Sequence, residues 1–102
     1  MNLVYDYKII MEALENNLLD YNSIGYTNID DVFTIDMDFG LFHMYEVSNY
    51  IFNVDDIFYN SDTGNEEESR TVITKETLGN CITELNRMNE EYRAQLEIEG
   101  DI

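Results

Sequence analysis

The sequence is poor in basic residues. Five of its 102 residues are Lys or Arg, against 22 Asp and Glu, so the formal net charge is −17 at pH 7. A folded domain of this size usually carries a net charge of roughly 2 to 8 in magnitude. Proteins that bind nucleic-acid backbones or anionic membranes directly need basic residues. The composition therefore excludes both of these as direct partners and favours a basic protein.

Cysteine and histidine are also scarce, with one of each, Cys81 and His43. One cysteine excludes an intrachain disulfide and fits a reducing compartment. A transition-metal site needs several His or Cys ligands at short spacing, and nucleophilic catalysis needs a nucleophile beside a base. Neither residue lies in such a motif. We therefore expect a buried, inert thiol at Cys81, a structural or surface His43, no cofactor and no enzymatic activity.

One acidic segment has the beginning of a calcium-loop pattern, Asp36-x-Asp38-x-Gly40. A calcium loop of that kind continues with glycine at its sixth position and glutamate at its twelfth. Here the twelfth position is Val47, and the sixth is not glycine. We therefore expect no metal site.

Long apolar runs are absent as well. Residues 1–11 include Asp6 and Lys8 and lack the basic segment followed by an apolar run that marks a signal peptide. The longest stretch without a charged residue is Tyr21–Ile29, whereas a membrane-spanning helix needs about 20 apolar residues. We expect a soluble protein of the cytoplasm, or of the host cytoplasm if a phage encodes it.

The sequence does contain enough apolar and aromatic residues for a core. Its hydrophobic share is 44%, with eight tyrosines and five phenylalanines, unlike a disordered acidic tail. The length is that of one small domain. We therefore expect a single acidic domain over residues 1–102.

Hydrophobic spacing predicts a helix at each end of the chain. Residues 3–21 have apolar side chains at helical spacing. A second helix is expected from an N-cap at Thr74, with Ile73 packing on Leu78, to Gly100. Its predicted buried face consists of Leu78, Ile82, Leu85, Met88, Tyr92 and Leu96.

The middle of the chain predicts strands. Residues 31–39 alternate between apolar and polar side chains, as a half-buried strand does. Residues 41–47 favour a second strand, with a helix over 41–52 as the alternative. Residues 50–58 are apolar enough to be buried, with a short helical turn capped by Asn53, and 70–73 favour a short strand. Residues 60–69 are polar and predict a mobile loop.

These elements predict an α+β fold with an N-terminal helix, a small antiparallel sheet and a long C-terminal helix. An all-α fold is the alternative, because the secondary structure of residues 41–58 is ambiguous.

The acidic residues are unevenly distributed. No Lys or Arg lies between Lys8 and Arg70, so the carboxylates of this interval have no local cationic partner. Because burying an unpaired carboxylate is costly, they must face solvent or another molecule. In the last helix, by contrast, Arg87 and Arg93 lie at helical spacing from glutamates.

The carboxylate spacing predicts a partner-binding surface. Carboxylates two apart on a strand stand about 6.6 Å apart, of the same order as the phosphate spacing of DNA. The predicted contact residues are Asp30, Asp31, Asp36, Asp38, Asp55, Asp56, Glu66, Glu67 and Glu68.

In size, charge and scarcity of basic residues, the chain resembles a broad class of small acidic phage proteins that block DNA-binding enzymes. These include anti-CRISPR, anti-restriction and DNA-repair inhibitors. The resemblance implies a non-catalytic inhibitor that mimics DNA charge. One alternative is an assembly module that forms a homodimer through Tyr92, Leu96 and Ile98 of its C-terminal helix. Another is an immunity protein that neutralises a basic toxin.

Overall fold

The computed structural model describes residues 6–59 and 66–100. In chain order the elements are α1 (Tyr7–Asn17), β1 (Tyr21–Thr27), β2 (Val32–Met37), β3 (Gly40–Ser48), β4 (Ile51–Tyr59), β5 (Glu66–Glu76) and α2 (Leu78–Gly100). The predicted α+β fold, with a helix at each end of an antiparallel sheet, is confirmed.

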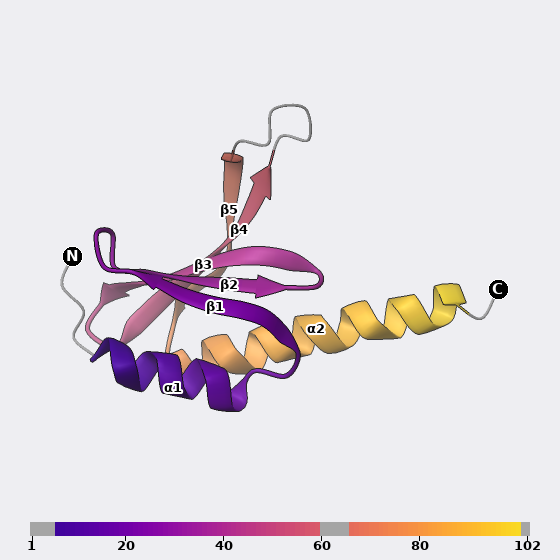
Figure 1. The fold of residues 1–102 in the computed structure, drawn as a ribbon, viewed down its shortest axis with the longest axis horizontal. Helices are drawn as coiled ribbons and strands as arrows, with labels where there is room; N and C mark the ends of the chain where they lie inside the picture. Colours follow the sequence, from indigo (N-terminus) through magenta and orange to yellow (C-terminus); the bar gives the residue numbers. More distant parts are fainter. Residues whose placement is uncertain (1–5, 60–65, 101–102) are drawn as a thin grey trace.

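The five strands form a meander in which each strand pairs with its neighbours in sequence. The order across the sheet is β1-β2-β3-β4-β5, and every pair is antiparallel. Both helices lie on one side of the sheet, and the far ends of β4 and β5 project from it as an arm (Figure 1). None of the helices in the described ranges is long and apolar enough to cross a membrane.

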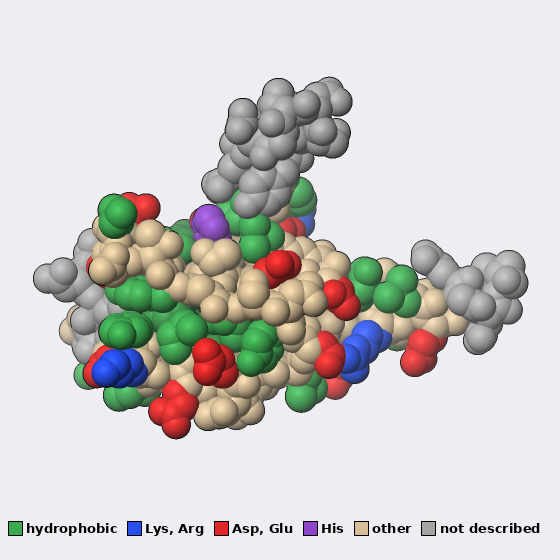
Figure 2. Space-filling model, viewed as in Figure 1, with side chains coloured by type: hydrophobic (Ala, Val, Ile, Leu, Met, Phe, Trp, Pro, Cys, Tyr) green, Lys and Arg blue, Asp and Glu red, His purple; other side chains and the backbone are tan. Residues whose placement is uncertain are grey.

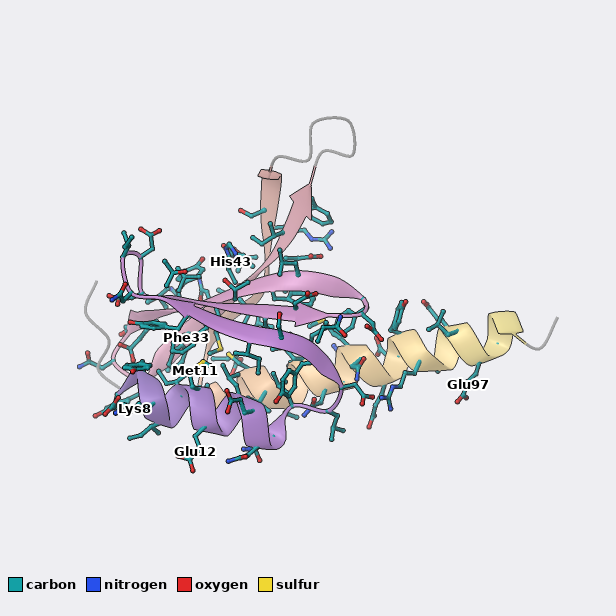
Figure 3. All side chains as sticks on the ribbon, viewed as in Figure 1. Lys8, Met11, Glu12, Phe33, His43 and Glu97 are labelled. Atoms are coloured by element: carbon teal, nitrogen blue, oxygen red, sulfur yellow. The ribbon has the colours of Figure 1, made fainter. Side chains whose placement is uncertain are left out.

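The core lies between the sheet and the two helices. Alternate residues of β2 and β3, among them Phe33, Ile35 and Met44, are fully buried on the helix-covered side. They pack with Ile10 and Leu14 of α1. The buried residues recur at every second position of the strands and every three to four positions of the helix, and together they form one apolar layer. In Figure 3, Met11 likewise points from α1 towards the sheet.

Helix α1 is shorter than the predicted 3–21. Its N-cap is Asp6, whose carboxylate accepts a hydrogen bond from the Lys8 N–H at 3.0 Å. The helix ends at Asn17, and the chain turns at Asp20 with a left-handed φ of 56°. Tyr21, expected at the helix end, instead begins β1.

Two asparagines of α2 bind the connection between α1 and β1. Asn86 accepts a hydrogen bond from the Leu19 N–H at 2.9 Å and donates one to the Asn17 carbonyl at 2.9 Å. The buried Asn89 donates to the Leu19 carbonyl at 3.0 Å. These bonds satisfy backbone groups that a helix end would otherwise leave unpaired.

Helix α2 begins later than predicted. Residues 70–76 all belong to β5, so Thr74 is a strand residue and the expected cap is wrong. Thr77 takes that role, because its hydroxyl accepts a hydrogen bond from the Asn80 N–H at 3.3 Å. Of the predicted buried face, Ile82 and Leu85 are buried, whereas Leu96 is 48% exposed.

Helix α2 extends past the sheet at its C-terminal end (Figure 1). Among the described residues, its last ring contact joins Tyr92 to Phe39 of the β2–β3 turn, with ring centroids 5.8 Å apart. Beyond it, Leu96 and Ile98 are exposed.

In the middle of the chain one further prediction is confirmed and two are wrong. Residues 41–47 do form a strand, within the longer β3. Residues 50–58 contain no helical turn and belong mostly to β4, where the Asn53 side chain accepts from the Lys75 N–H at 2.8 Å. Residues 66–69, expected in the loop, form the start of β5.

Candidate binding face

The side of the sheet away from α1 and α2 has no covering element in the described part of the chain (Figure 1). Its side chains come from alternate positions of the strands, opposite the buried set. We call them the open face. Its members include Val32, Thr34, Asp36, Leu41, His43, Tyr45, Asn53, Asp55, Ile57 and Thr71, of which Ile57 is buried.

A row of directly opposed residues crosses the open face. Thr34 of β2 lies opposite His43 of β3, and His43 lies opposite Asp55 of β4. Asp55 in turn lies opposite Thr71 of β5. Figure 3 shows His43 on the side of the sheet away from the helices. The register therefore places the one histidine of the chain beside a carboxylate.

Neighbouring hydroxyl groups hold the Asp55 carboxylate in place. The Tyr45 hydroxyl lies 3.1 Å from each Asp55 oxygen, and the Thr71 hydroxyl donates to one of them at 2.7 Å. A carboxylate that accepts hydrogen bonds from two hydroxyls has a fixed orientation. Of the predicted contact residues, Asp55 thus presents a pre-oriented carboxylate on the open face.

Three other predicted contact residues lie along β2 and at its ends. Asp36 is half-buried on the open face, Asp38 is exposed in the β2–β3 turn, and Asp30 is exposed in the β1–β2 turn. None of the three makes a side-chain hydrogen bond or ion pair with another described residue. Since a six-residue strand spans about 20 Å, these charges form a line of about that length or more.

Asp56 faces the opposite side of the sheet from Asp55. It is paired with Phe42 and Arg70 in the register, and the Arg70 guanidinium lies 3.8 Å from its carboxylate. Burial raises the pKa of Asp56, and the charge of Arg70 partly offsets that rise. The structure therefore does not bring the adjacent carboxylates of Asp55 and Asp56 together on one surface.

Asp31 is engaged within its own turn. Its backbone has a left-handed φ of 52°, and its carboxylate accepts a hydrogen bond from the Tyr26 hydroxyl at 2.7 Å. Burial, followed by this hydrogen bond, raises the pKa of Tyr26 to about 12. The phenol therefore remains a donor at neutral pH, and Asp31 fixes the geometry of the β1–β2 turn.

The remaining predicted contact residues, Glu66, Glu67 and Glu68, lie at the start of β5. Their side chains fall outside the described part of the structure, so their place in the contact set stays a prediction.

Four of the five cations lie away from the open face; the fifth, Lys75, is an exposed residue of β5 whose backbone N–H donates to Asn53 of that face. Arg87 pairs with Glu84 at 2.9 Å and with Glu91 at 2.5 Å along α2, as the sequence spacing predicted. Arg93 pairs with Asp20 and not, as its spacing predicted, with a described glutamate of α2; Arg70 lies on the side of Asp56. Lys8 is on α1. In Figure 2, blue side chains are seen mainly along the two helices.

The thiol of Cys81 is fully buried, as predicted. Burial, and to a smaller extent the charge of Glu76, raise its pKa to about 12, so the thiol is protonated at neutral pH. Among the described residues, no three His, Cys, Asp or Glu side chains are grouped as metal ligands.

Sequence reasoning missed the hydroxyl and amide members of the open face, Tyr45, Asn53 and Thr71. Asn53 and Asp55 are two apart, which is the strand period, and that spacing was the available signal. Thr71 had no such signal, because a register shift between Val54 and Asp55 decides which β5 residue faces Asp55.

Comparisons of the chain with family models, with curated proteins and with solved structures find no match in any of the three.

Proposed function

We propose that this protein is a non-catalytic inhibitor that occupies the basic nucleic-acid-binding surface of another protein, with its carboxylates in the place of phosphates. The observation that carries the proposal is the arrangement of charge on the sheet. Asp36 and Asp55 lie on the open face, Asp38 and Asp30 lie at the ends of β2, and strands β1 to β4 contain no Lys or Arg.

The lateral spacing supports the same proposal. Asp36 of β2 and Asp55 of β4 are separated by one intervening strand, which places their strands about 9.6 Å apart. The major groove of DNA is about 12 Å wide, so the separation between the Asp30–Asp38 line and Asp55 is comparable with that of phosphates across a groove. A sheet holds such charges rigidly, which lowers the entropy cost of binding.

The electrostatics predict fast association that weakens with salt. A net charge of −17 steers a basic partner towards the protein, and dissolved ions screen that attraction. An immunity protein against a basic toxin would share this behaviour. The two differ in whether the captured partner loses its ability to bind nucleic acid.

The test uses two variants with equal charge change. In the first, Asp30→Asn, Asp36→Asn and Asp38→Asn remove three carboxylates that have no partner among the described residues. In the matched control, Glu12→Gln, Glu15→Gln and Glu97→Gln remove three exposed carboxylates from the helices; Glu12 and Glu97 are labelled in Figure 3. The immobilised protein captures partners from host lysate at low salt, and a salt gradient releases them.

We expect the captured protein to lose duplex-DNA binding in fluorescence anisotropy when the wild-type chain is added. The sheet variant should require about tenfold more protein for the same effect, and the helix variant should act like wild type. Equal weakening by both variants, or simultaneous binding of DNA and inhibitor, would contradict the proposal.

A further inference from the structure

The two edges of the sheet differ in charge. Strand β1 forms one edge, and its residues from Tyr21 to Thr27 include no charged side chain and no proline. Strand β5 forms the other edge, and the part of it whose side chains are described carries the charged residues Arg70, Lys75 and Glu76. Charged side chains on an edge strand oppose pairing with a further strand. Its charges therefore protect β5 against pairing with a further strand, whereas β1 has no such protection.

The apolar side chains at the β1 edge are only partly covered. Ile24 and Tyr26 of β1 point to the helix-covered side, opposite Ile35 and Phe33 of β2, yet both remain half-buried. Met11 of α1 is half-buried beside the core as well. In Figure 2, green side chains gather between α1 and β1 on the face shown. The apolar layer of the core therefore extends to the β1 edge, where its side chains are only partly shielded from solvent.

We propose that β1 pairs with β1 of a second copy of this chain, in an antiparallel and two-fold symmetric arrangement that joins two sheets into one. The distribution of charge along the chain, rather than its net charge, points to this edge as the place for a second copy. Two molecules of net charge −17 repel each other, and β1 lies in the longest uncharged stretch of the sequence. It is thus where two copies meet without carboxylates directly opposed.

A basic protein is the less suitable occupant of this edge, because β1 offers it no carboxylate. The open face and the β1 edge are therefore chemically separate surfaces, one for a basic partner and one for a second copy.

The sequence of β1 suits a symmetric pairing centred on Ile24. In that register Ile24 lies opposite Ile24 of the partner copy, and Ser23 lies opposite the partner's Gly25. A symmetric interface uses the same patch on both molecules. Because side chains alternate between the two sides of a strand, Ser23 and Gly25 of both copies then lie on the side of the open face. Ile24 and Tyr26 lie on the helix-covered side and extend the apolar layer of the core across the two copies.

The first measurement is sedimentation of the full chain at low and high protein concentration, in low and high NaCl. We expect a monomer–dimer equilibrium that shifts towards dimer as NaCl rises, because screening weakens the repulsion between the two acidic molecules. Capture of a basic partner should respond to salt in the opposite direction. A failure of dimerisation therefore leaves the test of the proposed function intact.

The second measurement locates the interface with matched variants. Ile24→Lys places two like charges opposite each other across the two-fold axis and should raise the dimer dissociation constant at least about tenfold. Leu96→Lys makes the same change at an exposed apolar position of α2 and should leave dimerisation unchanged. A dimer that is lost with Leu96→Lys and kept with Ile24→Lys would overturn the proposal in favour of pairing through α2.

Amide hydrogen exchange on the unmodified chain tests the same edge without any risk of misfolding. Pairing should make alternate amides of β1 more protected at high protein concentration, with no such change along β5. A chain that stays monomeric under all these conditions, with concentration-independent exchange in β1, would overturn the proposal.

Discussion

At the residue scale, Asp56 illustrates a carboxylate that the fold disfavours. Its pKa is raised by burial and only partly restored by Arg70, whose side chain is 69% exposed. A carboxyl group whose pKa is higher in the folded than in the unfolded state binds its proton more tightly when folded. Its ionisation therefore lowers stability as the pH rises through the unfolded-state pKa towards the folded-state pKa.

This reasoning predicts that Asp56→Asn raises the free energy of unfolding at pH 7, because it removes the cost of the buried charge. The gain should shrink as the pH falls into the range where the carboxyl group of the wild type is protonated. Urea denaturation at several pH values measures it, with Asp38→Asn in the exposed β2–β3 turn as the control. A loss of stability with Asp56→Asn at pH 7 would mean that the ion pair with Arg70 outweighs burial.

At the element scale, the junction between β5 and α2 provides a comparison of two threonines. Thr77 accepts the Asn80 N–H at the start of α2, whereas Thr74 is an exposed residue of β5. We expect Thr77→Ala to lower the free energy of unfolding by about 1 kcal/mol, and Thr77→Ser to preserve most of it. Thr74→Ala should cost less than Thr77→Ala in the same urea denaturation experiment. The reverse order would show that the helix is capped where its sequence suggested.

The same elements show how far the sequence could be interpreted. The alternation of apolar and polar residues from Phe33 to Met37 predicted β2 correctly, because a strand with one buried and one exposed side shows this pattern in its sequence. Strand β1 was missed because Ser23 and Gly25 are weak strand formers. Its conformation depends on pairing with β2, through contacts such as Tyr26 opposite Phe33, and such long-range pairing is not visible in a local pattern.

The sequence predicted which residues of the candidate site are charged, but not which side of the sheet each of them faces. The absence of cations before Arg70 marked an acidic region, but it wrongly predicted that all of its carboxylates face solvent or a partner, because Glu46 is buried and accepts a hydrogen bond from the Tyr50 N–H at 3.2 Å. Whether Asp55 or Asp56 reaches the open face depends on the register of β4 against β3 and β5. A slip of one residue would exchange the two, and the sequence holds no local signal for that register.

At the scale of the whole molecule, charge repulsion acts on stability. A net charge of −17 favours the expanded unfolded chain over the compact fold, and salt screens that repulsion. We expect the unfolding temperature, followed by circular dichroism, to rise by roughly 5 °C between low and high NaCl. At a pH near the isoelectric point the same salt change should have little effect. A similar rise at both pH values would point to a cause other than charge.

The meander topology has a consequence for how quickly the protein forms. Because every strand pairs with its neighbour in sequence, the sheet can assemble hairpin by hairpin without closing a long loop. Topologies dominated by such short-range pairings fold faster than those with distant strand pairs. Contacts between the ends of the chain, such as the one between Asn86 of α2 and Asn17 of α1, form later. The sheet does not need them in order to begin forming. A newly synthesised chain can therefore form its open face soon after it leaves the ribosome.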